Sequence, residues 1–206
     1  MFSLSKRLIE TAHADAEMVT TIQPKSGWQS INLKELFEYR DLFFFLVWRD
    51  IKVLYAQTVL GFLWAIIQPL VQILLFTIVF GRVAKIATDG IPYFLFSTVA
   101  IIPWTFMSQA MTQSSQSLVT GQNVLGKVYF PRLIFPLTAV FAKLVDFLIS
   151  LVIVLFALIY YKVVPSWNFL LLPMFTLHMV CVAAGIGLWL SAMAIRFRDV
   201  KYAMTF

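Results

Sequence analysis

Charged residues are scarce in this sequence. Asp, Glu, Lys and Arg make up 13% of its 206 residues, while hydrophobic residues make up 61%. A soluble domain usually has about 25% charged and 45–50% apolar residues. The mean hydropathy of +0.86 agrees with this excess of apolar surface. The composition therefore excludes an ordinary soluble domain and predicts an integral membrane protein.

Cysteine and histidine are also rare. The single cysteine, Cys181, cannot form a disulfide within the chain. The two histidines, His13 and His178, are far apart, so no His/Cys cluster has metal-ligand spacing, and no Ser/His/Asp set is present. We therefore predict no cofactor and no enzymatic activity. His178 lies alone in an apolar segment, where a hydrogen-bonded packing role is favoured over a proton relay.

A phosphate-binding loop is matched only in part. Gly121–Lys127 fits the first seven positions of the P-loop pattern, but Val128 replaces the Ser or Thr that binds magnesium. The pattern also requires a preceding β-strand, and an apolar span precedes it here. The match is attributed to chance, and we predict that the chain does not hydrolyse ATP itself.

Long apolar runs account for most of the remaining sequence. About 20 apolar residues cross the 30 Å hydrocarbon core as a helix. Four segments reach this length, at about 59–80, 91–111, 133–161 and 169–195. The predicted fold class is thus an all-α integral membrane protein with four transmembrane helices, which form a transmembrane domain over 59–206.

The basic residues indicate the direction of these spans. Twelve Lys and Arg residues lie on the side of the N-terminal arm, the second connection and the tail, and three lie on the other side. Lys and Arg are enriched in cytoplasmic loops, so the N-terminus is predicted to be cytoplasmic. Since most of these residues flank apolar segments, the net charge of +6 indicates topology and not a nucleic-acid partner.

The segment before the first span divides into two parts. Residues 1–30 are predicted to be a mobile cytoplasmic arm, and residues 31–58 an amphipathic interfacial helix that leads into the span. Within it, Ile31–Lys52 has capping-box spacing at Asn32 and Glu35. Its apolar face would lie at the headgroup level; packing as a cytoplasmic helix on another subunit is the alternative. The charged face holds Lys34, Glu38, Asp41, Arg49 and Lys52, and the apolar face holds Leu33, Leu36, Phe37, Phe44, Val47, Trp48 and Ile51.

Three sequence blocks resemble one transporter family. They are Arg49–Gly61 (RDIKVLYAQTVLG) continuing through Phe62–Pro69 (FLWAIIQP), then Lys127–Arg132 (KVYFPR) and Ile195–Tyr202 (IRFRDVKY). In this order they resemble polysaccharide-exporting ABC permeases of the type-2 family, which move O-antigen, capsule or teichoic-acid chains. The resemblance extends from about Ile31 to the end of the chain.

The resemblance implies a homodimeric permease in the bacterial cytoplasmic (inner) membrane. Each copy would pair with a separate ATPase subunit and export a lipid-diphosphate-linked glycan. The family has six spans, so this chain resembles a fragment that lacks the last two. The resemblance places Arg49, Lys52 and Gly61 at the interface and the start of the first span. The cytoplasmic segment 112–132 would couple to the ATPase, with candidate residues Gln116, Leu118, Val124, Leu125, Lys127, Val128, Tyr129 and Phe130.

Polar and aromatic residues inside the spans are candidates for the substrate path. Gln68 and Gln72 are one helical turn apart in mid-span, where an unpaired amide is costly, so they face protein or a wet path. Hydrogen bonding between helices and a substrate role have equal weight. Trp64 and Trp104 are weaker candidates for stacking on sugars. Lys143 and Asp146 share a helical face and can pair; a structural ion pair is favoured over phosphate binding.

Two other functions remain as alternatives. A secondary transporter or channel not powered by ATP would need ionisable residues deep in several spans, and the third span alone has them. A membrane-embedded transferase would need clustered acidic residues at one membrane face. The sequence favours neither.

The predicted topology is testable by labelling. Single-cysteine variants Lys85→Cys and Arg198→Cys, each in a Cys181→Ser background, are treated with a membrane-impermeant maleimide on intact cells. We expect Lys85→Cys to react from outside and Arg198→Cys to react only after permeabilisation, because the basic flanks lie in the cytoplasm. Labelling of both positions from the same side would contradict the four-span topology.

Overall fold

The structure is a computed structural model, and it describes residues 33–56, 58–88, 90–122, 126, 131–197 and 199–204. The predicted arm at 1–30 and the predicted cap at Asn32 lie outside these residues. The helical segments of the described part are α2 (Leu33–Glu38), α3 (Arg40–Ala56), η1 (Gly61–Leu63), α4 (Trp64–Phe76), η2 (Thr77–Val83), α5 (Tyr93–Thr120), α7 (Ile134–Tyr160), η3 (Trp167–Leu171), α8 (Leu172–Arg196) and α9 (Asp199–Ala203).

Four helices of the described chain are long and apolar enough to cross a membrane. They are Gly61–Val83, formed by η1, α4 and η2, then Tyr93–Thr120, Ile134–Tyr160 and Trp167–Arg196. No strand occurs in the ranges that the structure describes. The predicted all-α fold with four transmembrane helices is confirmed.

The second span is longer than its apolar run. Helix α5 continues to Thr120, past the last apolar residue of the predicted span, and includes the polar stretch Gln113–Ser117. Ser114 and Ser115 within this stretch are fully buried. Small polar side chains allow helices to approach closely, so packing continues where hydropathy falls. The second connection is therefore shorter than the sequence indicated.

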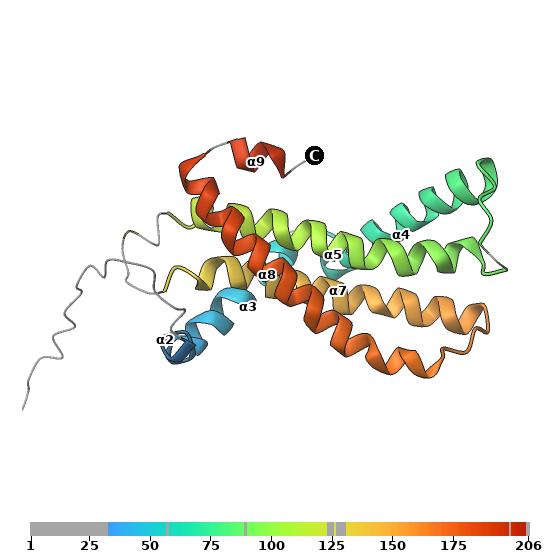
Figure 1. Cartoon of the computed structure of the whole chain (residues 1–206), viewed down its shortest axis with the longest axis horizontal. Coiled ribbons are helices and arrows are strands. Elements are labelled where there is room, and N and C mark those ends of the chain that lie inside the picture. The colour runs from blue at the N-terminus through green and yellow to red at the C-terminus, as the bar shows by residue number, and fades with distance from the viewer. Residues whose placement is uncertain are drawn as a thin grey trace, which may run out of the picture. The chain divides into compact units, whose positions relative to one another are not determined.

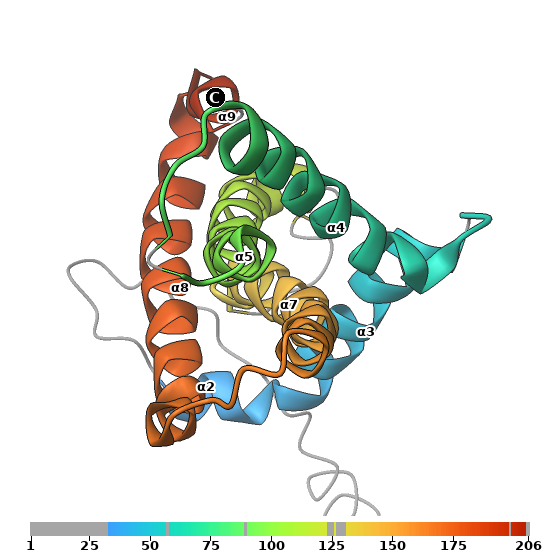
Figure 2. The same cartoon turned by 90° about the vertical axis from the view of Figure 1, so that its right-hand side faces the viewer.

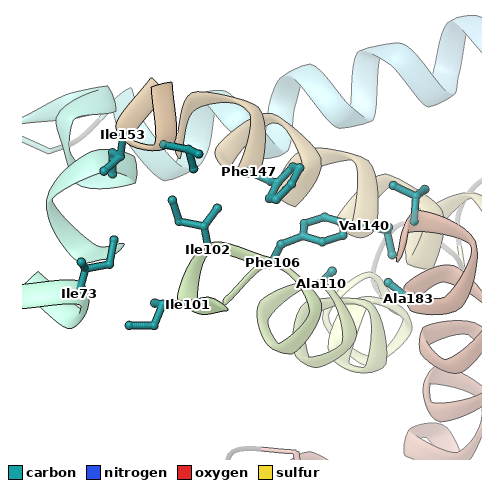
Figure 3. Close-up of a cluster of buried hydrophobic side chains, with 11 residues drawn as sticks. Ile73, Ile101, Ile102, Phe106, Ala110, Val140, Phe147, Ile153 and Ala183 are labelled. Atoms are coloured by element: carbon teal, nitrogen blue, oxygen red, sulfur yellow. The ribbon is translucent and has the colours of Figure 1, made fainter. Parts of the chain in front are cut away.

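Helices α5 and α7 lie side by side at the centre of the helical bundle (Figures 1 and 2). Helix α8 packs against α5, α4 packs against both central helices, and α3 packs against α7. The largest buried cluster joins α4, α5, α7 and α8, and Figure 3 shows its side chains meeting between these helices. The cluster contains Ile73, Ile101, Ile102, Phe106, Ala110, Val140, Phe147, Ile153, Val154, Val180 and Ala183.

Several buried hydroxyls within the spans bond to their own helix. Thr98 donates to the carbonyl of Phe94 at 2.6 Å, and Thr138 donates to that of Phe135 at 2.8 Å. Ser191 donates to the carbonyl of Leu188 at 2.8 Å. Bonds to a carbonyl three or four residues earlier satisfy a hydroxyl without a second helix. These side chains can therefore remain in the apolar interior.

Helix α3 presents two different apolar faces. Leu46, Ile51 and Tyr55 are buried, and the helix packs on α7 of the same chain. In contrast, Phe44 and Trp48 are 67% and 65% exposed. The sequence assigned Phe44, Trp48 and Ile51 to a single apolar face, and packing on α7 divides that face in two. An interfacial location for the exposed aromatic residues remains a prediction.

Helices α5 and α8 approach each other closely at Gly187. A Cβ atom at this position would lie 2.3 Å from Ser114 Oγ and 2.6 Å from Ser114 Cβ. Glycine is thus required here by space, because any side chain would push the two helices apart. Gly185, two residues earlier on the same helix, has no such neighbour within 4 Å.

These two glycines form a matched pair for a packing test. We expect Gly187→Ala to lower the free energy of unfolding by about 1–3 kcal/mol, the usual cost of overpacking. Gly185→Ala gives the helix the same propensity gain without a clash, so it should leave stability unchanged or slightly higher. Thermal unfolding in detergent measures both. Equal melting temperatures for the two variants would contradict the close α5–α8 contact.

Candidate functional site

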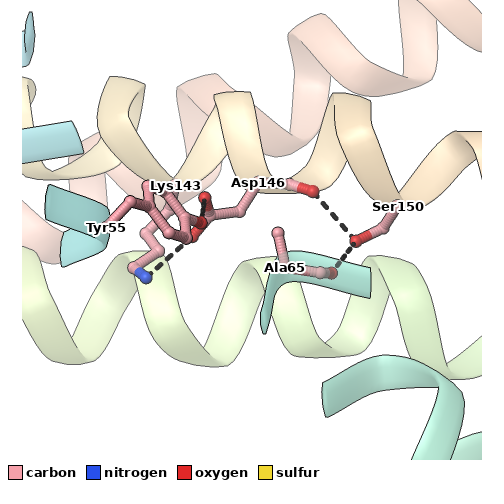
Figure 4. Close-up of polar contacts among 5 residues, drawn as sticks. All are labelled: Tyr55, Ala65, Lys143, Asp146 and Ser150. Carbon is pink, nitrogen blue, oxygen red and sulfur yellow. Dashed lines mark hydrogen bonds and ion pairs between the residues drawn. The ribbon is translucent and has the colours of Figure 1, made fainter. Parts of the chain in front are cut away.

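An ion pair is buried in the third span, beside helix α3. Lys143 Nζ lies 2.8 Å from Asp146 Oδ2, and Lys143 is only 6% exposed. The other carboxylate oxygen of Asp146 accepts a hydrogen bond from the Tyr55 hydroxyl of α3 (Figure 4). The pair predicted from the i,i+3 spacing is confirmed. Its link to α3 spans 91 residues of sequence and could not be predicted from spacing.

Tyr55 acts as a hydrogen-bond donor in this cluster. It lies in α3, before the first span, and burial raises the pKa of its phenol above the ordinary value. The hydrogen bond to Asp146 and the charge of that carboxylate raise the pKa further. The phenol therefore keeps its proton near neutral pH and holds the carboxylate toward α3.

Pro69 leaves one carbonyl of the first span without its helical hydrogen bond, and a side chain of α7 bonds to that carbonyl. Proline has no N–H group, so the carbonyl of Ala65, four residues earlier, lacks its helical partner. Ser150 Oγ lies 3.1 Å from this carbonyl and 2.9 Å from the carbonyl of Asp146, and its single proton is shared between them (Figure 4). Side chains of neighbouring helices commonly satisfy such groups in membranes. The hydrogen bond of Ser150 thus links the first span to the third.

A cavity of about 320 Å³ lies beside the Lys143–Asp146 pair. The end of α3, α4, α5 and α7 line it, and two predicted path residues, Trp64 and Gln68, are among its walls. Thr105 and Gln109 of α5 also face it. Thr105 and Gln109 are four residues apart on α5, as Gln68 and Gln72 are on α4. This spacing of polar residues could have identified Thr105 and Gln109 from the sequence.

The two glutamines of the first span differ in their bonding. Gln72 Oε1 accepts a hydrogen bond from Thr105 Oγ1 at 3.2 Å, which is a helix-to-helix contact. The Gln68 side chain is exposed and makes no hydrogen bond to the described residues. Trp104 is 72% exposed and is not among the residues that line the cavity. The structure therefore groups Trp64 and Gln68 but leaves Trp104 apart.

A second cavity of about 440 Å³ lies between α3, α5 and α7. Arg49 and Asp50 of α3 line it together with Gln113 and Gln116 of α5. Arg49 holds Asp50 through two hydrogen bonds of 2.7 and 3.0 Å. The structure thus brings together Arg49, predicted for the interface, and Gln116, predicted for ATPase coupling.

Lys52 and Gly61 share a smaller cavity of about 200 Å³ at the junction of α3 and the first span. Gly61 has a φ of +49°, in the left-handed region that favours glycine. It is the first residue of η1, so the chain changes direction here before the span. This conformation gives a physical reason for glycine at the position that the resemblance singled out.

Of the remaining residues predicted for ATPase coupling, the structure describes Leu118 and not the others. Leu118 is 6% exposed and packs with Leu46, Ile134 and Phe135, so it supports the fold beneath α3. Val124, Leu125, Lys127, Val128, Tyr129 and Phe130 lie outside the described residues. Helix α5 continues to Thr120, directly before Gly121, so a helix stands where a P-loop would need a strand.

The prediction for His178 was wrong. This side chain is exposed on α8 and makes no hydrogen bond to the residues that the structure describes. It is therefore not a hydrogen-bonded packing residue within this chain. Sequence alone placed it in an apolar helix but could not indicate which face of that helix is covered.

Comparison with known proteins gives a consistent result. Residues 41–206 match the family described as ABC-2 type transporter. An O-antigen export system permease protein of Myxococcus xanthus is 28% identical over 173 residues, which is 84% of this chain and 66% of the relative. Two proteins of the same name from Klebsiella pneumoniae are 29% and 26% identical over 171 residues, which is 82% of this chain and 64% of each relative. The chain thus spans slightly less than two thirds of the length of these curated relatives.

The buried ion pair generates a stability prediction. Asp146→Asn leaves Lys143 charged and unpaired, and breaking a buried pair costs about 3–5 kcal/mol. We expect a marked fall in the melting temperature in detergent. The double variant Lys143→Met with Asp146→Leu removes both charges and should recover most of that loss.

The exposed pair of Arg40 and Asp41 provides the control. Their side chains are 59% and 93% exposed, so Arg40→Ala should change the stability by less than about 1 kcal/mol. A wild-type melting temperature for Asp146→Asn would show that the pair is unimportant for the fold.

Proposed function

The chain belongs to the ABC-2 type transporter family, and from this membership we propose that it is the membrane-spanning permease subunit of an ABC exporter for a lipid-linked polysaccharide. As a member of that family it is a transport component, and ATP hydrolysis belongs to a separate ATPase subunit. The family match over residues 41–206 is the observation that carries this proposal.

The substrate class follows from the relatives. Three proteins of similar sequence are named as O-antigen export permeases. The structure supports a polar substrate, because cavities lined by glutamine and threonine lie between helices that are otherwise apolar. We assign Trp64, Gln68 and Gln72 to the part of the substrate path that this chain forms. Trp104 does not line the cavity, so it would line the path only if a different face of α5 also contributed to it.

The assembly is proposed to contain two copies of the permease in the bacterial inner membrane, with the N-terminus in the cytoplasm. Helices α4 and α8 support this arrangement, because most of their apolar side chains are exposed in the single chain. Leu74, Phe76 and Ile78 on the first span, and Leu177 and Trp189 on α8, are examples. Lipid and a second copy would both cover such surfaces.

Coupling to the ATPase is proposed for segment 112–132. Gln116 belongs to the part of this segment that forms the end of α5, and it lines the cavity beside Arg49. A partner bound there would contact α5 and α3 together. Binding of the partner would then act on the interfacial helix through Arg49 and Lys52.

The ionisable residues of the described spans disfavour a secondary transporter. Lys143 and Asp146 are bonded to each other, so neither is available as a free proton carrier in this state. Proton relays in transporters depend on several ionisable groups within the membrane. The ATP-driven reading is therefore preferred.

Partner capture tests the coupling proposal. The chain is coexpressed with its cognate ATPase, and Tyr129→Ala with Phe130→Ala is compared with wild type in copurification and in ATP-dependent export. Aromatic anchors at interfaces often contribute more than 1 kcal/mol each. We expect the double substitution to weaken ATPase capture about tenfold or more.

Lys85→Ala and Lys162→Ala serve as controls, since both residues lie at the ends of the spans opposite to segment 112–132. They should retain capture and export. Full ATPase capture by a chain with Gln116–Phe130 scrambled would exclude this segment as the docking site. Export that survives ATP depletion but collapses with an uncoupler would refute the ABC exporter itself.

A further inference from the structure

An apolar cavity of about 460 Å³ lies between α4, α5 and α7, and it shares no lining residue with the two polar cavities. Ile66 and Leu70 line it from α4, Phe94 lines it from α5, and α7 supplies the other lining residues. Figure 1 shows that the C-terminal ends of the first span and of α7 lie on opposite sides of the start of α5. The cavity thus occupies the space that opens where the first and third spans diverge.

Helix α7 lines this cavity with two rows of side chains. Ile153 and Ala157 are buried and form its floor. Val152, Phe156 and Tyr160 are exposed, follow one another at one helical turn, and form its edge. Because this edge is exposed, the cavity is a groove that opens sideways to the surroundings of the span.

The groove has nearly the length of one bilayer leaflet. Val152 and Tyr160 are eight residues apart, or about 12 Å along a helix that rises 1.5 Å per residue. Half of the hydrocarbon core is about 15 Å. Tyr160 ends α7 and Phe94 is the second residue of α5, so the groove starts where these spans end. It runs from there toward the middle of the membrane, in the extracytoplasmic leaflet of the predicted topology.

The groove is too narrow for another helix. A volume of about 460 Å³ over a length of about 12 Å gives a mean cross-section of about 40 Å². An α-helix with its side chains is about 10 Å or more across, which corresponds to about 80 Å². A helix of a second copy therefore does not fit inside it, whereas an extended hydrocarbon chain does. Water is a poor occupant because apolar walls offer it no hydrogen bonds.

Polar groups lie at the outer end of the groove. The hydroxyls of Tyr160 and Tyr161 make no hydrogen bond to the described residues, and the two rings pack edge to face with centroids 5.0 Å apart. Lys162 follows directly, is exposed, and has no ion-pair partner in the described part of the chain. Phenol groups and a cation at this depth complement the glycerol esters and the phosphate of a lipid headgroup.

We propose that this groove binds a phospholipid, with one acyl chain between α4 and α7 and the phosphate beside Lys162. The apolar lining, the leaflet length and the narrow cross-section select the acyl chain, and the charge at the outer end selects the phosphate. The bound chain fills the space between the first and third spans and supports the angle between them. This binding does not depend on the proposed export function.

A photoreactive phospholipid tests the proposal. The full chain is reconstituted in phosphatidylglycerol vesicles that contain a trace of phosphatidylglycerol with a diazirine in mid-chain, and adducts are mapped by mass spectrometry after irradiation. Bulk lipid reaches the exposed faces, whereas Ile153 and Ala157 are reached from within the groove. We expect adducts at these two positions and one phospholipid per chain retained in detergent. Adducts confined to exposed faces, such as Leu177 and Trp189 of α8, would overturn the proposal.

Filling the groove provides a matched comparison. Val152→Trp places a large ring in the groove, and Leu148→Trp places one on the same helix a turn earlier, at an exposed position that does not line it. We expect Val152→Trp to lower groove adducts and retained phospholipid at least about tenfold, and Leu148→Trp to change neither. Melting temperatures in lipid check that both variants fold. Equal labelling of the two folded variants would contradict the proposal.

A second pair of variants tests the headgroup contact. Lys162→Ala removes the cation beside the groove, and Lys85→Ala removes one from another position with a similar left-handed φ, +49° against +54°. One lysine near a lipid phosphate contributes about 1 kcal/mol, so Lys162→Ala should weaken phospholipid retention about fivefold, and Lys85→Ala should not. Unchanged retention in Lys162→Ala would overturn the assignment to a phospholipid.

Two further measurements distinguish other occupants. A probe with the same diazirine on a branched isoprenoid phosphate is compared with the phosphatidylglycerol probe, and stronger groove labelling by the isoprenoid would overturn the proposal. A disulfide between two copies of Phe156→Cys, in a Cys181→Ser background, would place a second copy at the groove and also overturn it. Export is measured in none of these arms, so their failure leaves the proposed function standing.

Discussion

Hydrocarbon offers no hydrogen bonds, so every polar group in the spans of this chain needs a partner in protein or in water that protein holds. The chain meets this constraint in several ways. Hydroxyls such as Thr98 and Thr138 bond to their own helix. The carbonyl freed by Pro69 receives Ser150 from a neighbouring helix. Lys143 and Asp146 neutralise each other. Some polar groups have no partner among the described residues: several glutamines line the two polar cavities, Ser114 Oγ is buried beside Gly187 of α8, and His178 is exposed on α8.

This distribution separates two kinds of surface on one small bundle. The outer faces of α4 and α8 are apolar and exposed, as suits contact with lipid or another protein. The side of α5 that lines the two polar cavities carries Thr105, Gln109, Gln113 and Gln116. The proposed export function would need both surfaces, because a permease must remain in the bilayer while lowering the barrier for a polar substrate. The family match and the arrangement of polar residues are both consistent with the proposed function.

The sequence predicted the spans well because a long charge-free run has few alternatives to a membrane helix. It also predicted the Lys143–Asp146 pair, since helical spacing fixes neighbours on one face. It missed the bond between Tyr55 and Asp146 and the bond between Gln72 and Thr105, because these partners meet only through tertiary packing. The end of α5 was placed too early for a similar reason. Ser114 and Ser115 are polar by composition but are buried by neighbouring helices. The exposure of His178 likewise depends on what covers α8.

Asp146 connects three parts of the chain that are distant in sequence. Its carboxylate holds both Lys143 and Tyr55, and its backbone carbonyl shares Ser150 with the first span. A force that tilts α3 must therefore either pull the third span along or break a buried bond. Helix α3 and the third span are therefore joined, and the left-handed residue Gly61 marks the change of direction between α3 and the first span. A displacement of α3 would in this way reach the third span through Asp146 and the first span through Ser150.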